Sequence, residues 1–145
     1  MTTPEMSMAL ADQPCFALQT TSFAITRAYK ELLAPLDLTY TQYTIMLALW
    51  ERDGLALREL SEKLQTDPPS LTPVIRRLEE KRLLTRERDE NDERRLVIAL
   101  TDKGVGLQDS ARHIPYQMMC DVGLNETEAR ELIALLARMR ESLSD

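Results

Sequence analysis

One stretch decides the fold of this chain: Leu83-Leu-Thr-Arg-Glu-Arg-Asp-Glu-Asn-Asp-Glu-Arg-Arg-Leu-Val-Ile-Ala-Leu-Thr-Asp-Lys-Gly104. The stretches 83–88 and 94–100 mix polar and apolar residues, and we interpret each as a strand with one buried face. The residues between them, 89–93, are charged and turn-forming. The stretch therefore predicts a two-stranded hairpin with a long charged loop.

The rest of the chain reads as helical. Apolar residues recur every three or four positions on both sides of the hairpin, as in amphipathic helices. Only 4 of the 145 residues are glycine, which also favours helices over an all-β fold. The pattern predicts helices over about 12–35, 39–54, 57–65, 68–82, 101–120 and 125–143.

Capping signals support several of these helix starts, and they fix the order of the elements. This order is helix, helix, short helix, helix, hairpin, helix, helix, which is typical of a winged helix-turn-helix. The outer helices carry more apolar surface than one small core needs, which favours a dimer. The capping signals are Thr39 with Gln42, Asp67 before Pro68, Thr101 or Asp102, and Asn125 with Glu128.

Length and composition bound the class of protein. A chain of 145 residues is long enough for one domain with a real core, so we expect a single domain over 1–145. No signal peptide and no membrane-length apolar run is visible. We therefore expect a cytoplasmic protein whose two cysteines stay reduced unless oxidised for a purpose.

The net charge of −6 is unusual for a protein that binds nucleic acid. The charge is uneven, however: residues 76–95 carry eight Lys/Arg and seven Asp/Glu, and the other residues carry ten and seventeen. A DNA contact must therefore come from a small local patch, and its strength must depend on geometry more than on long-range attraction.

The helix over 68–82 is the candidate for DNA recognition, because a helix in the major groove turns its N-terminal side chains toward the bases. The alternative is a solvated helix face without a DNA contact. Arginine at a wing tip can enter the minor groove or pair with phosphate, and Asp92 is best interpreted as a brace for Arg94. The candidate DNA-binding residues are Ser70, Thr72, Arg76, Arg77, Arg94 and Arg95.

The hairpin stretch resembles the wing of MarR-type transcription regulators, through its Asp-x-Arg core and the Leu-Thr-x-x-Gly that follows. The resemblance covers about 12–143. It implies a mainly helical homodimer with a small β-hairpin wing, joined by its N- and C-terminal helices (about 12–38 and 102–143). The part over about 55–100 would bind a pseudo-palindromic operator in double-stranded DNA. The resemblance also implies a repressor that is not an enzyme and that needs no cofactor.

Two further stretches resemble the organic hydroperoxide resistance regulators of that family, the OhrR type. They are Cys15-Phe-Ala-Leu18 and Leu36-Asp-Leu-Thr-Tyr-Thr-Gln-Tyr43, the second leading into Met46-Leu-Ala-Leu-Trp50. The resemblance implies that Cys15 reacts with an organic hydroperoxide as inducer. It also implies that two tyrosines of the partner subunit, Tyr29 and Tyr40, form hydrogen bonds near the thiol. Gln19 departs from the tyrosine common in the family, and Pro68-Pro69 replaces small polar residues.

The chemistry of Cys15 agrees with this interpretation. A thiolate is the nucleophile, and the N–H groups at a helix start stabilise it. Oxidation gives a sulfenic acid, then a disulfide or a sulfinic acid. The alternative is that Cys15 is a small buried hydrophobe. In the two-cysteine subtype that the resemblance suggests, Cys120 would form an intersubunit disulfide with oxidised Cys15. A structural role for Cys120, or reaction of Cys15 with a small thiol, is the alternative.

Two other functions compete with a peroxide-sensing repressor. One is a MarR-type regulator released by a small aromatic ligand, with Cys15 incidental. The other is a thiol peroxidase, which the predicted wing and the absence of a Pro-x-x-x-Thr-x-x-Cys run argue against. We expect no metal site, because the one histidine, His113, and two scattered cysteines do not form the close ligand set that zinc needs.

Overall fold

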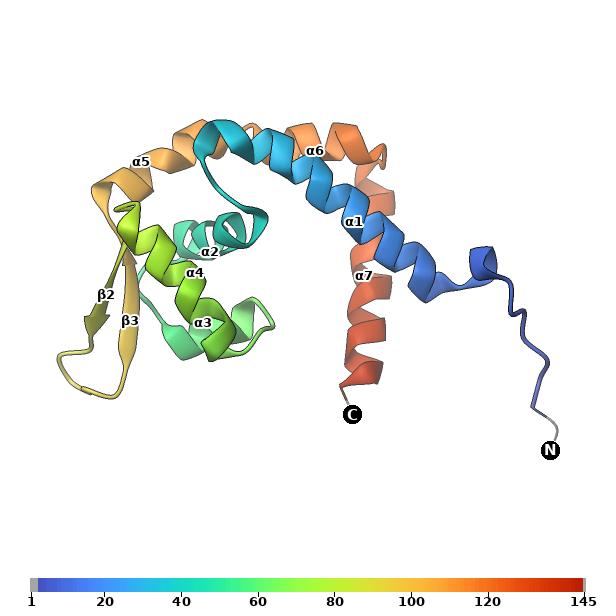
Figure 1. Cartoon of the computed structure of the whole chain (residues 1–145), viewed down its shortest axis with the longest axis horizontal. Coiled ribbons are helices and arrows are strands. Elements are labelled where there is room, and N and C mark those ends of the chain that lie inside the picture. Colours follow the sequence, from blue (N-terminus) through green and yellow to red (C-terminus); the bar gives the residue numbers. More distant parts are fainter. Residues whose placement is uncertain (1–2, 145) are drawn as a thin grey trace. The chain divides into compact units, whose positions relative to one another are not determined.

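The computed structural model of the protein describes residues 3–144 (Figure 1). The chain divides into two compact units between Arg112 and His113. The first unit contains the 3-10 turns η1 (Leu10–Asp12) and η2 (Ala34–Leu36), the helices α1 (Pro14–Leu33), α2 (Tyr40–Glu51), α3 (Leu57–Lys63), α4 (Pro68–Glu80) and α5 (Asp102–Ala111), and the strands β1 (Leu55–Ala56), β2 (Leu84–Arg88) and β3 (Leu96–Leu100). The second unit contains α6 (Ile114–Val122) and α7 (Glu126–Leu143).

Local capping sets the helix starts where the sequence predicts them. At the start of α2, Thr39 Oγ1 accepts from the N–H of Gln42 at 3.2 Å, and Gln42 Oε1 accepts from the N–H of Thr39 at 3.1 Å. Asn125 and Glu128 form the same capping box at the start of α7. The capping signals predicted from sequence are therefore confirmed, and the fold is mainly helical with a small wing, as predicted.

The sheet has three strands rather than the predicted two. β2 and β3 pair antiparallel over all five residues of each strand, which confirms the hairpin. β1 pairs with the other edge of β3, with Leu55 opposite Ile98. A two-residue strand shows no alternation in sequence, so periodicity alone does not reveal it. Because β1 leads directly into α3, this pairing attaches the start of α3 to the wing.

The core of the first unit lies between α2, α3, α4 and the sheet. This core holds α4 and the wing in place, because each buried apolar side chain contributes about 1.5–3 kcal/mol to the free energy of unfolding. On α4, Val74 is half-buried, whereas Leu71, Ile75 and Leu78 are buried. Side chains exposed by 2% or less include Tyr43, Ile45, Met46, Leu49, Leu60, Leu71, Ile75, Leu78, Leu84 and Ile98.

The prediction of one continuous helix from 101 to about 120 is wrong. The structure has two helices there, since α5 ends at Ala111 and α6 begins at Ile114. Pro115 lies in the first turn of α6. Its ring would clash with the carbonyl four residues earlier in a continuous helix, and it has no N–H to donate. Cys120 therefore belongs to α6, a separate short helix in the second unit.

Only the C-terminal part of α1 packs against the rest of the first unit. Leu33 is buried, whereas residues 14–24 are all exposed. Figure 1 shows the N-terminal half of α1 extending beyond α2, α3 and α4. The helix starts two residues later than predicted, because η1 precedes it and Gln13 is its N-cap. The exposed part of α1 carries the large apolar side chains Phe16, Leu18 and Phe23.

Candidate nucleic-acid interface and thiol site

The start of α4 is a capped helix terminus. The carboxylate of Asp67 accepts from the Ser70 hydroxyl at 2.6 Å and from the Ser70 N–H at 3.0 Å. These two hydrogen bonds, the hydroxyl first, hold the pKa of the Asp67 carboxyl below its usual range. Ser70 is thus committed to the cap, and a base contact would have to share its hydroxyl.

The other three candidates on α4 differ in how freely they can reach DNA. Thr72 is half-buried and its hydroxyl donates to the Pro68 carbonyl at 3.1 Å. Arg76 and Arg77 are exposed, and neither makes an ion pair or side-chain hydrogen bond within residues 3–144. Of the four candidates on α4, these two arginines are therefore the most accessible.

α4 is fixed to the wing by Glu79. Glu79 Oε1 accepts from Arg86 Nη2 at 3.0 Å and Nε at 3.2 Å, and Oε2 accepts from the Arg86 N–H at 3.2 Å. The Arg86 side chain is the largest cause holding the pKa of Glu79 below its usual range. Because Arg86 lies in β2, α4 and the hairpin are held together.

The wing loop between β2 and β3 is closed by its own hydrogen bonds. Asp92 Oδ1 accepts from the backbone N–H of Arg94 at 3.0 Å, so the brace predicted for Asp92 acts on the backbone. The exposed Arg94 side chain makes no ion pair within the part of the chain that the structure describes. The Arg95 side chain is instead paired with Glu59 and Asp89.

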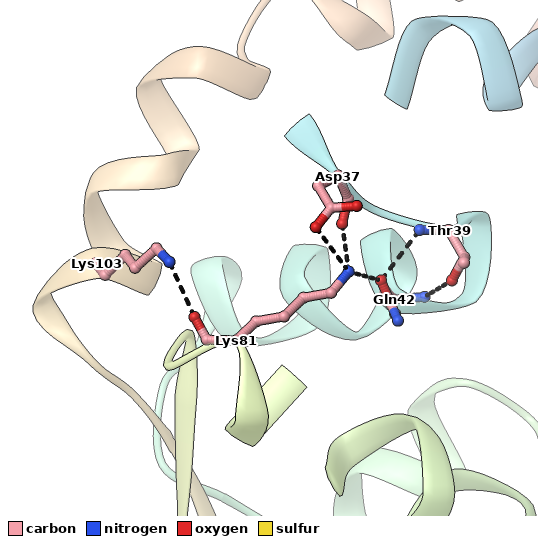
Figure 2. Close-up of polar contacts among 5 residues, drawn as sticks. All are labelled: Asp37, Thr39, Gln42, Lys81 and Lys103. Atoms are coloured by element: carbon pink, nitrogen blue, oxygen red, sulfur yellow. Dashed lines mark hydrogen bonds and ion pairs between the residues drawn. The ribbon is translucent and has the colours of Figure 1, made fainter. Parts of the chain in front are cut away.

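Lys81, directly after α4, joins three elements, as Figure 2 shows. Its Nζ donates to the Asp37 carbonyl and, at 3.1 Å, to Gln42 Oε1, and it lies 3.6 Å from Asp37 Oδ2. Its own carbonyl accepts from Lys103 Nζ of α5 at 3.0 Å. The end of α4 is thereby tied to the corner between α1 and α2 and to α5. Sequence reasoning missed this cluster, because Lys81 and Asp37 are 44 residues apart.

Cys15 is the second residue of α1 and is exposed. Gln13, the N-cap, provides no side-chain cap, because its amide donates to the carbonyls of Ser7 and Ala9. The N–H groups of Cys15 and Phe16 therefore have no partner within the helix and can face an anion at this end. Within a single copy of the chain the Cys15 side chain is thus exposed rather than buried.

Tyr29 and Tyr40 lie together, with ring centroids 4.6 Å apart. Tyr43, which the sequence did not assign to the site, joins them with its centroid 5.8 Å from that of Tyr29. Burial first, and then the neighbouring phenols, raise the pKa of Tyr29 to about 12. Tyr29 is therefore a neutral phenol near pH 7 and can donate a hydrogen bond.

Tyr29 does not reach the cysteine of its own chain along α1. Cys15 and Tyr29 are 14 residues apart in one helix, which is about 21 Å at a rise of about 1.5 Å per residue. Cys120 is exposed in α6, three residues before Gly123, which ends that helix in the left-handed region.

A family model for the transcriptional regulator SarA/Rot matches residues 27–110, from the second half of α1 into α5. The match covers 84 of the 145 residues. The chain belongs to the SarA/Rot family of transcriptional regulators.

This SarA/Rot-type regulator is 42% identical over 135 residues to the HTH-type transcriptional regulator TtmR of Methylorubrum extorquens, a match that covers 93% of this chain and 69% of that one. It is 39% identical over 125 residues to the organic hydroperoxide resistance transcriptional regulator of Bacillus subtilis, covering 86% and 83% of the two chains.

The fold of this SarA/Rot-type regulator is similar to that of reduced AbfR bound to DNA, with a TM-score of 0.79 and 29% identity over 94% of this chain and 95% of that one. AbfR has also been solved with a disulfide formed, and that structure gives a TM-score of 0.62. The winged helix and the assignment as a regulator rather than an enzyme are thereby confirmed. Of the helices described, none combines the length and the apolar character needed to cross a membrane.

Proposed function

We propose that this regulator binds a pseudo-palindromic DNA operator as a homodimer, represses transcription there, and releases the DNA when an organic hydroperoxide oxidises Cys15. One observation carries the proposal. Cys15 is an exposed thiol at an uncapped helix start, in a chain 39% identical to a regulator of organic hydroperoxide resistance.

Homodimerisation is supported by the apolar surface that each unit leaves uncovered. α7 has no buried residue at all, although its sequence is strongly amphipathic. α1 exposes large apolar side chains over its first half. Two copies related by a two-fold axis would present two copies of α4 to two half-sites. A dimer would also allow Tyr29 and Tyr40 of one protomer to serve Cys15 of the other. On α7 the exposed apolar residues are Leu132, Ile133, Leu135 and Leu143.

The DNA contact is proposed for α4 in the major groove and for the wing beside it. Arg76 and Arg77 supply cationic side chains with five N–H donors each, suited to phosphate or to a guanine edge. Ser70 and Thr72 sit nearer the helix start, and Arg94 extends from the wing.

Replacing Arg77 by alanine is expected to weaken operator binding about tenfold or more, because the loss of one such contact costs about 1–3 kcal/mol. The measurement is fluorescence anisotropy on a duplex that the wild-type protein selects from a randomised pool. Arg138→Ala, which removes the same charge from α7 in the second unit, is the matched control. An equal loss in both variants would show that Arg77 contributes only net charge.

The redox step follows from thiol chemistry. The Cys15 thiolate attacks the outer oxygen of the hydroperoxide, an S–O bond forms, the O–O bond breaks, and the alcohol leaves after taking a proton. The sulfenic acid then condenses with the Cys120 thiol, which forms a disulfide and releases water. A disulfide requires the two Cα atoms within about 7 Å, so the two helices that carry the thiols must approach or be held that close.

Non-reducing electrophoresis tests the disulfide. After treatment with cumene hydroperoxide, the wild-type protein is expected to run at twice its subunit mass, and dithiothreitol should reverse the change. Cys15→Ser and Cys120→Ser should each remain at the subunit mass, because an intersubunit bond needs both thiols. If Cys120→Ser still gives the doubled band, Cys120 is not the partner of Cys15.

A hollow beside the tyrosines favours a second candidate function, release by a small aromatic anion. It has a volume of about 470 Å³, and Arg27 and Lys30 line it together with apolar side chains, which suits an aromatic carboxylate. The third cation of its lining, Lys81, is paired there with Asp37. Release of the Cys15→Ser variant by benzoate would support this function. Its lining includes Arg27, Lys30, Ala34, Leu38, Tyr40 and Lys81.

A further inference from the structure

The guanidinium of Arg95 is held by two carboxylates from different elements. Its Nη2 pairs with Oε1 of Glu59, in the first turn of α3, and its Nε lies 3.6 Å from Oδ2 of Asp89, directly after β2. We call Glu59, Asp89 and Arg95 the wing clasp. The clasp connects the wing loop to a helix 36 residues earlier in the chain.

The backbone of the same residues closes the loop. The Asp89 N–H donates to the Arg95 carbonyl at 2.8 Å, and the Arg95 N–H donates to the Asp92 carbonyl at 3.0 Å. The side chains of Arg95, Glu59 and Asp89 are 45%, 36% and 25% exposed. They are thus partly shielded from water, unlike the freely exposed pairs that contribute almost nothing.

The clasp stands between the wing and the start of the recognition helix. Glu59 and Arg95 line a hollow of about 540 Å³ together with Arg94 and with Pro68, the first residue of α4. Carboxylates at this place would repel DNA phosphates if they were unpaired. Arg95 offsets part of their charge and at the same time uses donors that a phosphate would need.

We infer that Arg95 is a positioning residue for DNA binding rather than a phosphate contact: through Glu59 and Asp89 it fixes the wing loop to α3 and so sets where Arg94 lies relative to α4. The inference rests on the DNA-binding surface proposed above, and it revises the assignment of Arg95 made from sequence. A loop held in place before DNA arrives loses less conformational freedom on binding.

Glu59→Gln tests whether Glu59 holds the wing loop or is merely a carboxylate near the phosphates, because the two cases predict opposite changes in DNA affinity. If Glu59 were only a carboxylate near phosphate, its removal would strengthen binding of the selected duplex. The clasp predicts the opposite, a loss of about three- to tenfold, because the loop is no longer held. Glu62→Gln, on the same helix and paired with Arg58, is the matched control and should not weaken binding.

Arg95→Ala and the double variant complete the test. The clasp predicts a similar loss of affinity for Arg95→Ala. It also predicts that the double variant, Glu59→Gln with Arg95→Ala, binds no worse than either single variant. The dependence of affinity on salt should stay unchanged. A phosphate contact instead predicts that the slope of log affinity against log salt falls by about 0.9 for each copy of Arg95. Asp89→Asn should give a smaller loss, and circular dichroism should show all variants folded.

Binding of Glu59→Gln at or above the wild-type affinity would overturn the inference, as would a reduced salt slope in Arg95→Ala. All of these measurements use the reduced protein without peroxide, so they do not depend on the redox proposal. A normal affinity in Arg77→Ala would instead refute the DNA-binding surface itself.

Discussion

Cys15→Ser is expected to remain on its operator when organic hydroperoxide is added. The wild-type protein should instead lose about 5- to 150-fold in operator affinity, which is the usual range of coupling between two sites. A serine hydroxyl without an adjacent base is not a nucleophile near pH 7, so no sulfenic acid forms. Because Cys15 is exposed, and serine is of similar size and keeps a hydrogen-bonding group there, binding of the reduced protein should change by less than about twofold.

Cys120→Ser is the matched variant for this prediction. It keeps the reactive thiol of Cys15 but removes the proposed partner, so it should be oxidised by peroxide without forming the intersubunit bond. If it still leaves DNA, formation of the sulfenic acid alone is sufficient for release. If it stays bound, the disulfide is required.

Gly104→Ala is expected to lower the free energy of unfolding by about 3 kcal/mol or more, equivalent to about 10 °C in the melting temperature. A Cβ at position 104 would lie 2.0 Å from the carbonyl oxygen of Leu83, which is backbone and cannot move aside as a side chain can. The Leu83 carbonyl already accepts from the N–H of Thr101 at 3.1 Å, and the Gly104 carbonyl accepts from Trp50 Nε1 at 2.9 Å. Thermal and urea unfolding, followed by circular dichroism, measure the loss.

Gly106 provides the control within the same helix. A Cβ built there has no heavy atom within 4 Å. Gly106→Ala should therefore raise the free energy of unfolding by up to about 1 kcal/mol, which is the difference in helix propensity between the two residues. Equal stability of the Gly104 and Gly106 variants would contradict the close approach of α5 to the Leu83 backbone, directly before β2. The Leu-Thr-x-x-Gly pattern of the wing thus has a physical reason, because only glycine allows this approach.

The features that could be predicted from sequence are local. A capping box depends on two residues three apart, and a hairpin depends on alternation within about twenty residues. Thr39 with Gln42, Asp67, and the pairing of β2 with β3 were therefore readable in the sequence. The tyrosine pair came from the family resemblance, and the structure places Tyr29 and Tyr40 together.

The features that could not be predicted depend on contacts between distant segments. β1 exists because Leu55 meets Ile98, and the wing clasp exists because Glu59 meets Arg95. Neither pair has a signature in periodicity or charge pattern. The break before Ile114 is a different case, since Pro115 was visible but the apolar pattern continued across it.

We propose that, when an organic hydroperoxide is present, oxidation of Cys15 is the event that removes this regulator from DNA. The most direct test is a hydroperoxide titration of the protein–duplex complex, with wild type and Cys15→Ser side by side. Anisotropy reports bound DNA, and the mass of the peptide that contains Cys15 reports its oxidation in the same samples. We predict that loss of bound DNA rises in proportion to oxidised Cys15 in the wild-type protein and is absent from the serine variant. Release of the serine variant at the same peroxide concentration would contradict the claim.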